Sequence, residues 1–443
     1  MSPVSSFMSL LASFAPLMTP ASFENFRLLA SGWALSTRRR TVTELIQRVG
    51  AVQLKSYSTF HRFFNRARWS IDEAGRVVLS LALRAIPEDS PVRLVVDDTL
   101  CKKGGQHIFG TGMHRDALAS TRKLTRLSWG HNWVVIGVIV EFPFARGVSW
   151  CLPIAFRLYV TKSRPKSQRW RQEIDYRTRP ELAVEMLEMI AEWYPDRRFS
   201  LVGDSAYGGG SVLKNLPEHF QLTSRIVMDA ALFAPPPKRY SGMGRPRRRG
   251  RRLPSPKQIA SSKTRWKKLS LQLYGAKRRV QVKETKGLWL KGDYRQIKVV
   301  IVRDPRGVNK DEAFYSTDIK ASATSILQSY ARRWSVEVAF ENAKGHFGFE
   351  DPQNRTVKAV QRTAPFGALL YSVVILWFNA HGVKKCRFPD RPWYERKCVA
   401  SFGDMIDTLR VESLREYFRR PPDSTRGRQK SLQAACAALG LVA

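Results

Sequence analysis

The sequence predicts a mixed α/β protein, with a β-rich insertion in its main sheet and a helical N-terminal region before it. Three observations support this fold class. Residues 1–88 contain few turn formers and repeat apolar side chains at helical spacing. From Val92, apolar strands are followed by an amphipathic helical segment. Residues 222–318 then resemble several short strands around a basic loop, and helical patterns return after them.

The balance of charge indicates a polyanionic partner. The chain contains 75 Lys and Arg against 37 Asp and Glu, a formal net charge of +38. Such self-repulsion opposes compaction, and nucleic acid is the usual partner that offsets it. Because 43% of the residues are hydrophobic, the chain can still bury a core. An architectural nucleic-acid binder is the plainer alternative to an enzyme.

Cysteine usage and hydropathy favour a soluble, cytoplasmic and nucleoid-associated protein. The five cysteines are odd in number and show no CxxC pairing, so neither a disulfide framework nor a zinc site is expected. The apolar stretch Phe7–Met18 has no basic residues before it, unlike a signal peptide. The longest apolar run, about 366–380, is shorter than the ~20 residues that span a bilayer. We expect it to be a buried core helix and expect no membrane association.

Within the N-terminal region, TVTELIQRVG and KSYSTFHRFFNRARW predict two short helices joined by a turn. Thr41 and Glu44 form a capping-box pattern at the first one. The second mixes basic residues such as Arg62 and Arg66 with phenylalanines, which suits a helix that packs on one side and contacts DNA phosphates on the other. An ordinary basic surface helix has the same composition.

Two apolar strands end in an acid. Asp97 closes VRLVV and Asp204 closes FSLVG, with strands expected at 131–142 and 148–160 and a helix at 181–194 between them. The carboxyl ends of strands in an α/β sheet are where ligand crevices form, and carboxylates there can share Mg²⁺ ions. Each Asp alone could instead be a cap or turn former. Asp98 competes with Asp97 as a metal ligand.

A long helix predicted over 324–348 places four functional side chains in one stripe. Tyr330, Arg333, Glu337 and Lys344 fall within a narrow arc at ~100° per residue. Glu337 would complete a three-carboxylate metal site, while Arg333, Lys344 and Tyr330 would contact DNA. Glu341 lies on the same face and is the alternative third carboxylate.

These residues resemble the Tyr-Arg-Glu-Lys signature of cut-and-paste bacterial insertion-sequence transposases, which belong to the DDE superfamily. Asp97-Asp98-Thr99 and the segment DSAYG at Asp204 are similar to the other two motifs of that group. The resemblance implies a ribonuclease-H-like core interrupted by a β-rich insertion. It also implies that Asp97, Asp204 and Glu337 bind two Mg²⁺ ions, for which Mn²⁺ would substitute.

The same resemblance implies partners and a base-flipping residue. The partners would be double-stranded DNA, both the element's terminal inverted repeats and target DNA, bound by a homodimer. In such relatives a flipped base stacks on an aromatic residue of the insertion. Trp289 is the first candidate for that role here and Trp266 the second, although either could be a core aromatic.

Two weaker features are basic loops. Arg247, Arg248 and Arg249 lie in GRPRRRGRR, a candidate phosphate-clamping loop or a merely solubilising one. Lys102 and Lys103 follow the first Asp motif and could lie against substrate phosphates or form a plain basic turn. The spacing of the histidines at 107, 114 and 131 matches no metal motif, so we expect structural roles for them.

These observations divide the chain into five predicted segments. They are a helical DNA-binding domain (1–88), the first part of the catalytic core (89–221), the β-rich insertion (222–318), the second part of the core (319–385) and a basic C-terminal region (386–443). The leading hypothesis is a DNA transposase acting by two-metal phosphoryl transfer. The alternatives are a metal-dependent nuclease that does not transpose and a catalytically inactive DNA-binding derivative.

Overall fold

The computed structural model describes residues 2–121, 123–162, 175–237, 247–273, 275–388 and 397–419. Its α-helices are α1 (Ser5–Leu11), α2 (Pro20–Leu35), α3 (Val42–Arg48), α4 (Tyr57–Asn65), α5 (Ile71–Leu83), α6 (Arg179–Trp193), α7 (Gly210–Lys214), α8 (Pro256–Ser261), α9 (Ala323–Arg332), α10 (Trp334–Gly345), α11 (Val357–Trp377) and α12 (Phe402–Phe418).

Its strands are β1 (Val92–Lys102), β2 (Gly112–Arg115), β3 (Leu127–Glu141), β4 (Ser149–Tyr159), β5 (Phe199–Gly203), β6 (Phe220–Ile226), β7 (Leu232–Phe233), β8 (Arg252–Leu253), β9 (Lys267–Leu273), β10 (Ala276–Trp289), β11 (Arg295–Arg303) and β12 (Glu312–Ser316). The mixed α/β class predicted from the sequence is therefore confirmed.

One mixed sheet organises the described residues. Its strand order is β2-β3-β1-β5-β6-β12-β11-β10-β7-β8, with β4 beside β3 and β9 beside β10. The β1, β5 and β6 strands run parallel to one another, while β3 is antiparallel to β1. The strands expected at 131–142 and 148–160 are β3 and β4, and the helix expected at 181–194 is α6. The two strands match because each contains a continuous apolar run that is buried, and α6 matches because its apolar residues recur at helical spacing.

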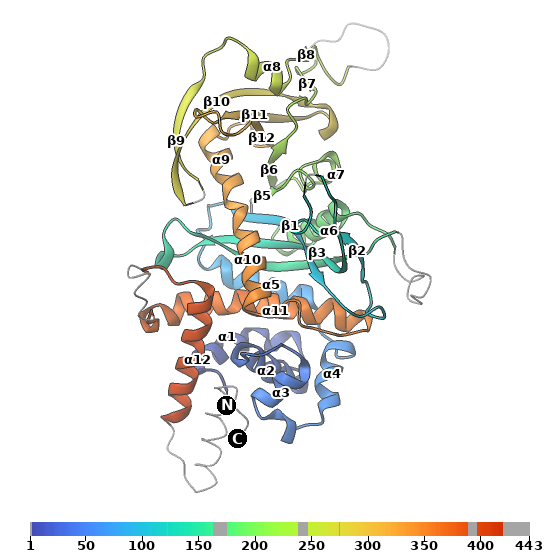
Figure 1. Cartoon of the computed structure of the whole chain (residues 1–443), viewed down its shortest axis with the longest axis vertical. Coiled ribbons are helices and arrows are strands. Elements are labelled where there is room, and N and C mark those ends of the chain that lie inside the picture. Colours follow the sequence, from blue (N-terminus) through green and yellow to red (C-terminus); the bar gives the residue numbers. More distant parts are fainter. Residues whose placement is uncertain are drawn as a thin grey trace.

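The strands of residues 222–318 continue the main sheet. Their link to it is the antiparallel pair of β6 and β12, which joins Ile226 to Ala313 and Thr223 to Ser316. Figure 1 shows β7 to β12 forming the upper part of the molecule, with α9 descending from them toward α10 and the strands β1 and β3. The chain therefore leaves the core after β6 and returns through α9 directly to the carboxyl end of β1.

Helix α11 is the central buried helix that the apolar run predicted. It is long and apolar enough to cross a membrane by length and composition, but 78% of its most apolar window is buried inside the fold. The ring of Phe366 contacts Phe26, Trp33, Phe63 and Phe64 from α2 and α4. On its other side α11 packs against β4 and α5. The N-terminal helices and the sheet thus share one hydrophobic core.

Two expected details differ in the structure. The helix predicted over 324–348 is two consecutive helices, α9 and α10, separated at Arg333, which itself keeps helical dihedral angles. The capping box at α3 is half formed: the Thr41 hydroxyl accepts from the N–H of Glu44, but the Glu44 carboxylate accepts from Arg48 and Ser36 instead. An arginine one turn along the helix offers Glu44 a stronger, charged donor than the backbone does.

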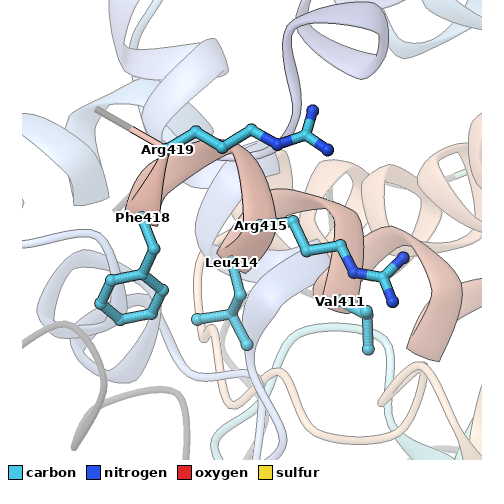
Figure 2. A pocket seen from close by; sticks show the side chains of 5 residues that line it. All are labelled: Val411, Leu414, Arg415, Phe418 and Arg419. Atoms are coloured by element: carbon cyan, nitrogen blue, oxygen red, sulfur yellow. The ribbon is translucent and has the colours of Figure 1, made fainter. Parts of the chain in front are cut away.

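Helix α12 carries an open hollow on its outer side. Figure 2 shows the five residues that line it, which are Val411, Leu414, Arg415, Phe418 and Arg419. In Figure 1 α12 lies beside α1, in the lower part of the molecule and away from the α9–α10 junction. The lining contains no carboxylate, histidine or cysteine, so this hollow is not a candidate active site.

Candidate active site

The register of the parallel strands brings Asp97 and Asp204 together. Val96 of β1 pairs with Gly203 of β5, and this parallel pairing ends there. Asp97 and Asp204 are the next residues on the two chains, where this parallel pairing ends. The expectation that Asp97 closes its strand is wrong, because β1 continues to Lys102 through its antiparallel pairing with β3. The Asp97 and Asp204 charges are close enough to perturb each other. The two Asp residues that follow apolar segments in the sequence are therefore neighbours in the folded protein.

Arg333 joins the third carboxylate to the first. One terminal nitrogen of its guanidinium donates to Asp97 Oδ2 over 2.7 Å, and the other donates to Glu337 Oε1 over 2.6 Å. Arg333 stands at the α9–α10 junction, and Glu337 follows one turn later on α10. A planar guanidinium can bridge two carboxylates in this way because its donors form a fixed fork. Asp97 and Glu337 therefore face the same cation from two different elements.

Within the described part of the chain, no group of three or more His, Cys, Asp or Glu side chains is close enough to hold a metal ion. The Arg333 guanidinium lies between Asp97 and Glu337 and pairs with both, so these two carboxylates do not contact each other directly. The carboxylate oxygens are nevertheless the donor type that Mg²⁺ and Mn²⁺ accept. The residues present fit a divalent cation in chemistry, with Arg333 supplying the positive charge between them.

Burial is the main perturbation of the Asp97 carboxyl. It raises the pKa of Asp97 to about 7; the charge of Arg333 and the N–H of Asp98 oppose the rise, while the charges of Asp204 and Asp98 add to it. Its Oδ1 accepts from the N–H of Asp98, over 2.9 Å. A buried carboxyl of this kind is the arrangement in which an additional cation is most favourable.

Asp98 points to the other side of β1 and is occupied by protein donors. Side chains alternate along a strand, so neighbours face opposite sides of the sheet. Asp98 Oδ2 accepts from Asn132 at 2.9 Å and Arg179 at 2.8 Å, and Oδ1 accepts from the Tyr207 hydroxyl at 2.9 Å. These donors come from β3, α6 and the turn after β5. The arrangement favours Asp97 over Asp98 as the metal ligand.

Asp204 combines a turn-forming role with its position beside Asp97. Its Oδ1 accepts from the N–H groups of Ala206 and Tyr207, at 2.8 and 3.3 Å, and its carbonyl accepts from Ser224 at 2.8 Å. The turn-former interpretation is therefore correct for one carboxylate oxygen. It does not compete with a site role, because these bonds fix the side chain at the strand end.

The remaining members of the predicted stripe are placed differently. Tyr330 is buried and packs against Phe314, with ring centroids 4.6 Å apart and the ring planes tilted by 53°. Lys344 donates to the Leu100 carbonyl of β1 at 2.6 Å and pairs with Glu350 at 3.6 Å. In this structure both residues hold α9 and α10 against the sheet. The helical stripe alone could not distinguish such anchoring from contact with a ligand.

The two tryptophans proposed for base stacking are both engaged in the fold. Trp289 is only 5% exposed and packs on Tyr315, with centroids 5.3 Å apart. Trp266 lies under Arg303, whose guanidinium carbon is 4.2 Å from the ring centroid. Trp334, by contrast, follows Arg333 directly and is 52% exposed. No local sequence pattern distinguishes this exposed tryptophan from the buried ones.

The two basic loops contain both residues that pair within the fold and residues that are exposed. Residues 244–246 of the arginine-rich loop lie outside the described residues. Arg248 pairs with Asp293 at 3.0 Å, and Arg249 lies 4.1 Å over the Phe233 ring, while Arg247 is exposed. Lys103 is buried and donates to the Glu350 carbonyl at 2.6 Å, which is a structural role. Lys102 pairs with Asp116 at 2.8 Å.

The fold and this carboxylate arrangement agree with a comparison to known families. Residues 13–287 match the model described as "DDE superfamily endonuclease", and the chain belongs to this family. The matched segment contains Asp97 and Asp204 and ends before Glu337. Endonucleases of this superfamily act on DNA and use divalent metal ions. No curated protein sequence matches the chain.

Proposed function

We propose that this endonuclease is a transposase, which cuts the ends of its own mobile element and joins them to target DNA. The observation that carries the proposal is that Asp97 and Asp204 lie where the parallel pairing of β1 and β5 ends, with the Arg333–Glu337 pair bonded to Asp97. The net charge of +38 supports binding to long stretches of DNA phosphate. A homodimer, which would hold both element ends, is part of this proposal.

In this proposal Asp97, Asp204 and Glu337 would hold two Mg²⁺ ions, or Mn²⁺ in their place. Bound divalent ions lower the pKa of attacking water and stabilise the leaving oxygen in phosphoryl transfer. The protein's own part is to hold the carboxylates ready. Arg333 orients Asp97 and Glu337, the donors around Asp98 fix the end of β1, and Lys344 ties α10 to the Leu100 carbonyl.

Residues other than the three carboxylates are proposed to contact DNA because their side chains are exposed. Trp334 presents an exposed aromatic ring beside Arg333, and aromatic rings stack on unpaired bases at ~1–3 kcal/mol per base. Arg247, Arg248 and Arg249 are all exposed and suit phosphate contacts, although Arg248 also pairs with Asp293 and Arg249 lies over the Phe233 ring. Tyr330 and Trp289 would support the site through packing.

The test is Mg²⁺-dependent cleavage of a supercoiled plasmid that carries the coding gene with its native flanking DNA. Wild type is compared with Glu337→Gln and with Glu341→Gln as the matched control. Glu341 is exposed and lies one helical turn beyond Glu337. We expect paired cuts at the flanks with wild type and E341Q, joining of the released segment to a second plasmid, and neither reaction with E337Q.

The other outcomes separate the alternatives. Cleavage at scattered positions without joining would identify a nuclease that does not transpose. Binding of the plasmid by wild type without any cleavage would identify an inactive DNA-binding derivative. Loss of activity in E341Q with retention in E337Q would assign the third carboxylate to Glu341 instead.

A further inference from the structure

The β9–β10 hairpin projects beyond the sheet as a two-stranded ribbon. Lys267–Leu273 pairs with Ala276–Val282, whereas the pairing of β10 with β11 begins only at Gln281. Within the described residues, the outer half of the hairpin therefore has no third strand on either side. Figure 1 shows the hairpin at the outer edge of the upper part of the molecule, alongside α9.

The two faces of this ribbon have different chemistry. Residues that are paired across the strands point to the same side. One side carries Leu269 opposite Val280, the buried Leu271 opposite Arg278 and the buried Val282 opposite Lys267, and α9 packs against β9. The opposite side, called here the polar ribbon face, consists of the pairs Lys268–Gln281, Ser270–Arg279 and Gln272–Lys277.

The polar ribbon face is strongly positive. Its residues Lys268, Ser270, Lys277, Arg279 and Gln281 border a hollow of about 950 Å³. The same hollow is also lined by residues of the other side of the ribbon and by the turn between β11 and β12, namely Leu269, Ala276, Arg278, Val280, Pro305 and Arg306. Residues 263–283 contain eight Lys and Arg and no Asp or Glu. The nearby Asp304 is already compensated, because it accepts from Arg306 and Asn309. Nothing acidic in this segment offsets the attraction for a polyanion.

The base of the ribbon is fixed to the sheet. Trp266, directly before β9, lies between Lys283 and Arg303, at 4.7 and 4.2 Å from their charged groups. Lys283 donates to the carbonyls of Ile259 and Ser262, each at 2.9 Å. An ordered base of this kind lowers the entropy cost of binding a large partner.

We propose that the polar ribbon face binds the major groove of the same DNA duplex that the carboxylates cut. A two-stranded β-ribbon fits this groove, and Arg, Lys, Gln and Ser are side chains that contact phosphates and base edges. The ribbon packs on α9, the helix that leads directly to Arg333 and Glu337.

The experiment measures binding of a fluorescein-labelled, random-sequence duplex about three helical turns long, by anisotropy across a salt series. Lys268→Ala/Lys277→Ala on the polar ribbon face is compared with Lys257→Ala/Lys267→Ala. Both pairs remove two exposed lysines from the same part of the chain, but Lys257 is on α8 and Lys267 points to the opposite side of the ribbon. Equal thermal midpoints establish that both variants are folded.

We expect K268A/K277A to reduce the slope of log K against log salt by about 1.8, corresponding to a roughly 60-fold loss of affinity at ~0.1 M salt. Dimethyl sulfate protection of guanine N7 in the major groove should be lost in the same variant. Equal slopes and protection in the two double variants would overturn the proposal. The proposal depends on the DNA-cutting function, but binding is measured without cleavage, so an inactive chain would fail the plasmid test and still give these results.

Discussion

Arg333 donates a hydrogen bond of 2.7 Å to Asp97, a residue that lies in the sheet on the other side of the insertion in sequence. This bond joins the two parts of the core and supplies the cation nearest to the buried carboxyl. Replacing Arg333 with Ala leaves both Asp97 and Glu337 without it. We expect a loss of about 1–3 kcal/mol in the free energy of unfolding, measured in urea, together with loss of plasmid cleavage. Arg333→Lys should recover part of the stability but not the two-carboxylate bridge; full activity in R333A would contradict this role.

Metal binding should depend on Asp97 and not on Asp98. Mn²⁺ at about one hundred times its Kd should stabilise the wild type by about 2.7 kcal/mol, seen as a higher thermal midpoint. Asp97→Asn should lose this increase, because it removes a carboxylate that faces Asp204 and Glu337. Asp98→Asn should retain it. Isothermal titration with Mn²⁺ provides a direct check, and the reverse pattern would assign the ligand to Asp98.

Asp98 should matter for stability and positioning. In Asp98→Asn an amide group would face donors from Arg179, Asn132 and Tyr207, so at least one of the hydrogen bonds is lost. We expect unfolding to become easier by about 1.5–3 kcal/mol, since the bonds are to a charged group. Urea denaturation measures this change. A D98N variant as stable as the wild type would show that the network contributes little.

Two tryptophans should separate packing from DNA contact. Trp289→Ala removes a buried ring beside Tyr315 and should cost about 3–5 kcal/mol of stability. Trp334→Ala removes an exposed ring and should change stability by less than ~0.5 kcal/mol. We expect W334A, in contrast, to weaken binding of a duplex with one unpaired base near the cut. If W334A binds this duplex normally, Trp334 is an ordinary surface residue.

His131 should make the fold sensitive to acid. Burial lowers the pKa of His131 to about 3, and the charge of Lys103 lowers it further, although its hydrogen bond to the Phe109 carbonyl opposes this. The unfolded chain therefore takes up a proton near pH 6.5 that the folded chain does not. The stability contribution of His131 is complete above pH 6.5 and falls by about 2 kcal/mol on going to pH 5. His131→Gln should show a smaller loss over this range in urea titrations; an equal loss would exclude His131 as the cause.

The parts of the site that could be predicted from sequence are those with a local signal. Asp97 and Asp204 each follow an apolar strand, and Glu337 follows Arg333 at the i,i+4 spacing of a helix. The donors to Asp98 could not be predicted, because Asn132, Arg179 and Tyr207 come from three elements that only the folded sheet brings together. The side on which Tyr330 and Lys344 pack was equally inaccessible, since a stripe on a helix does not specify what it faces. The two faces of the β9–β10 ribbon could not be predicted either. Alternation shows which residues of one strand share a side, but not which residues of the other strand pair with them.

The shared burial of α11 has a consequence for engineering. Trp33 donates from its indole to the Phe347 carbonyl, and the rings of α2 and α4 fill one side of α11 while β4 fills the other. The helices before β1 cannot be exchanged as a cassette, because removing them would expose a whole side of the most apolar helix to water. A chimeric enzyme that carries an added DNA-binding domain should therefore keep these helices and have the foreign domain attached beyond α12.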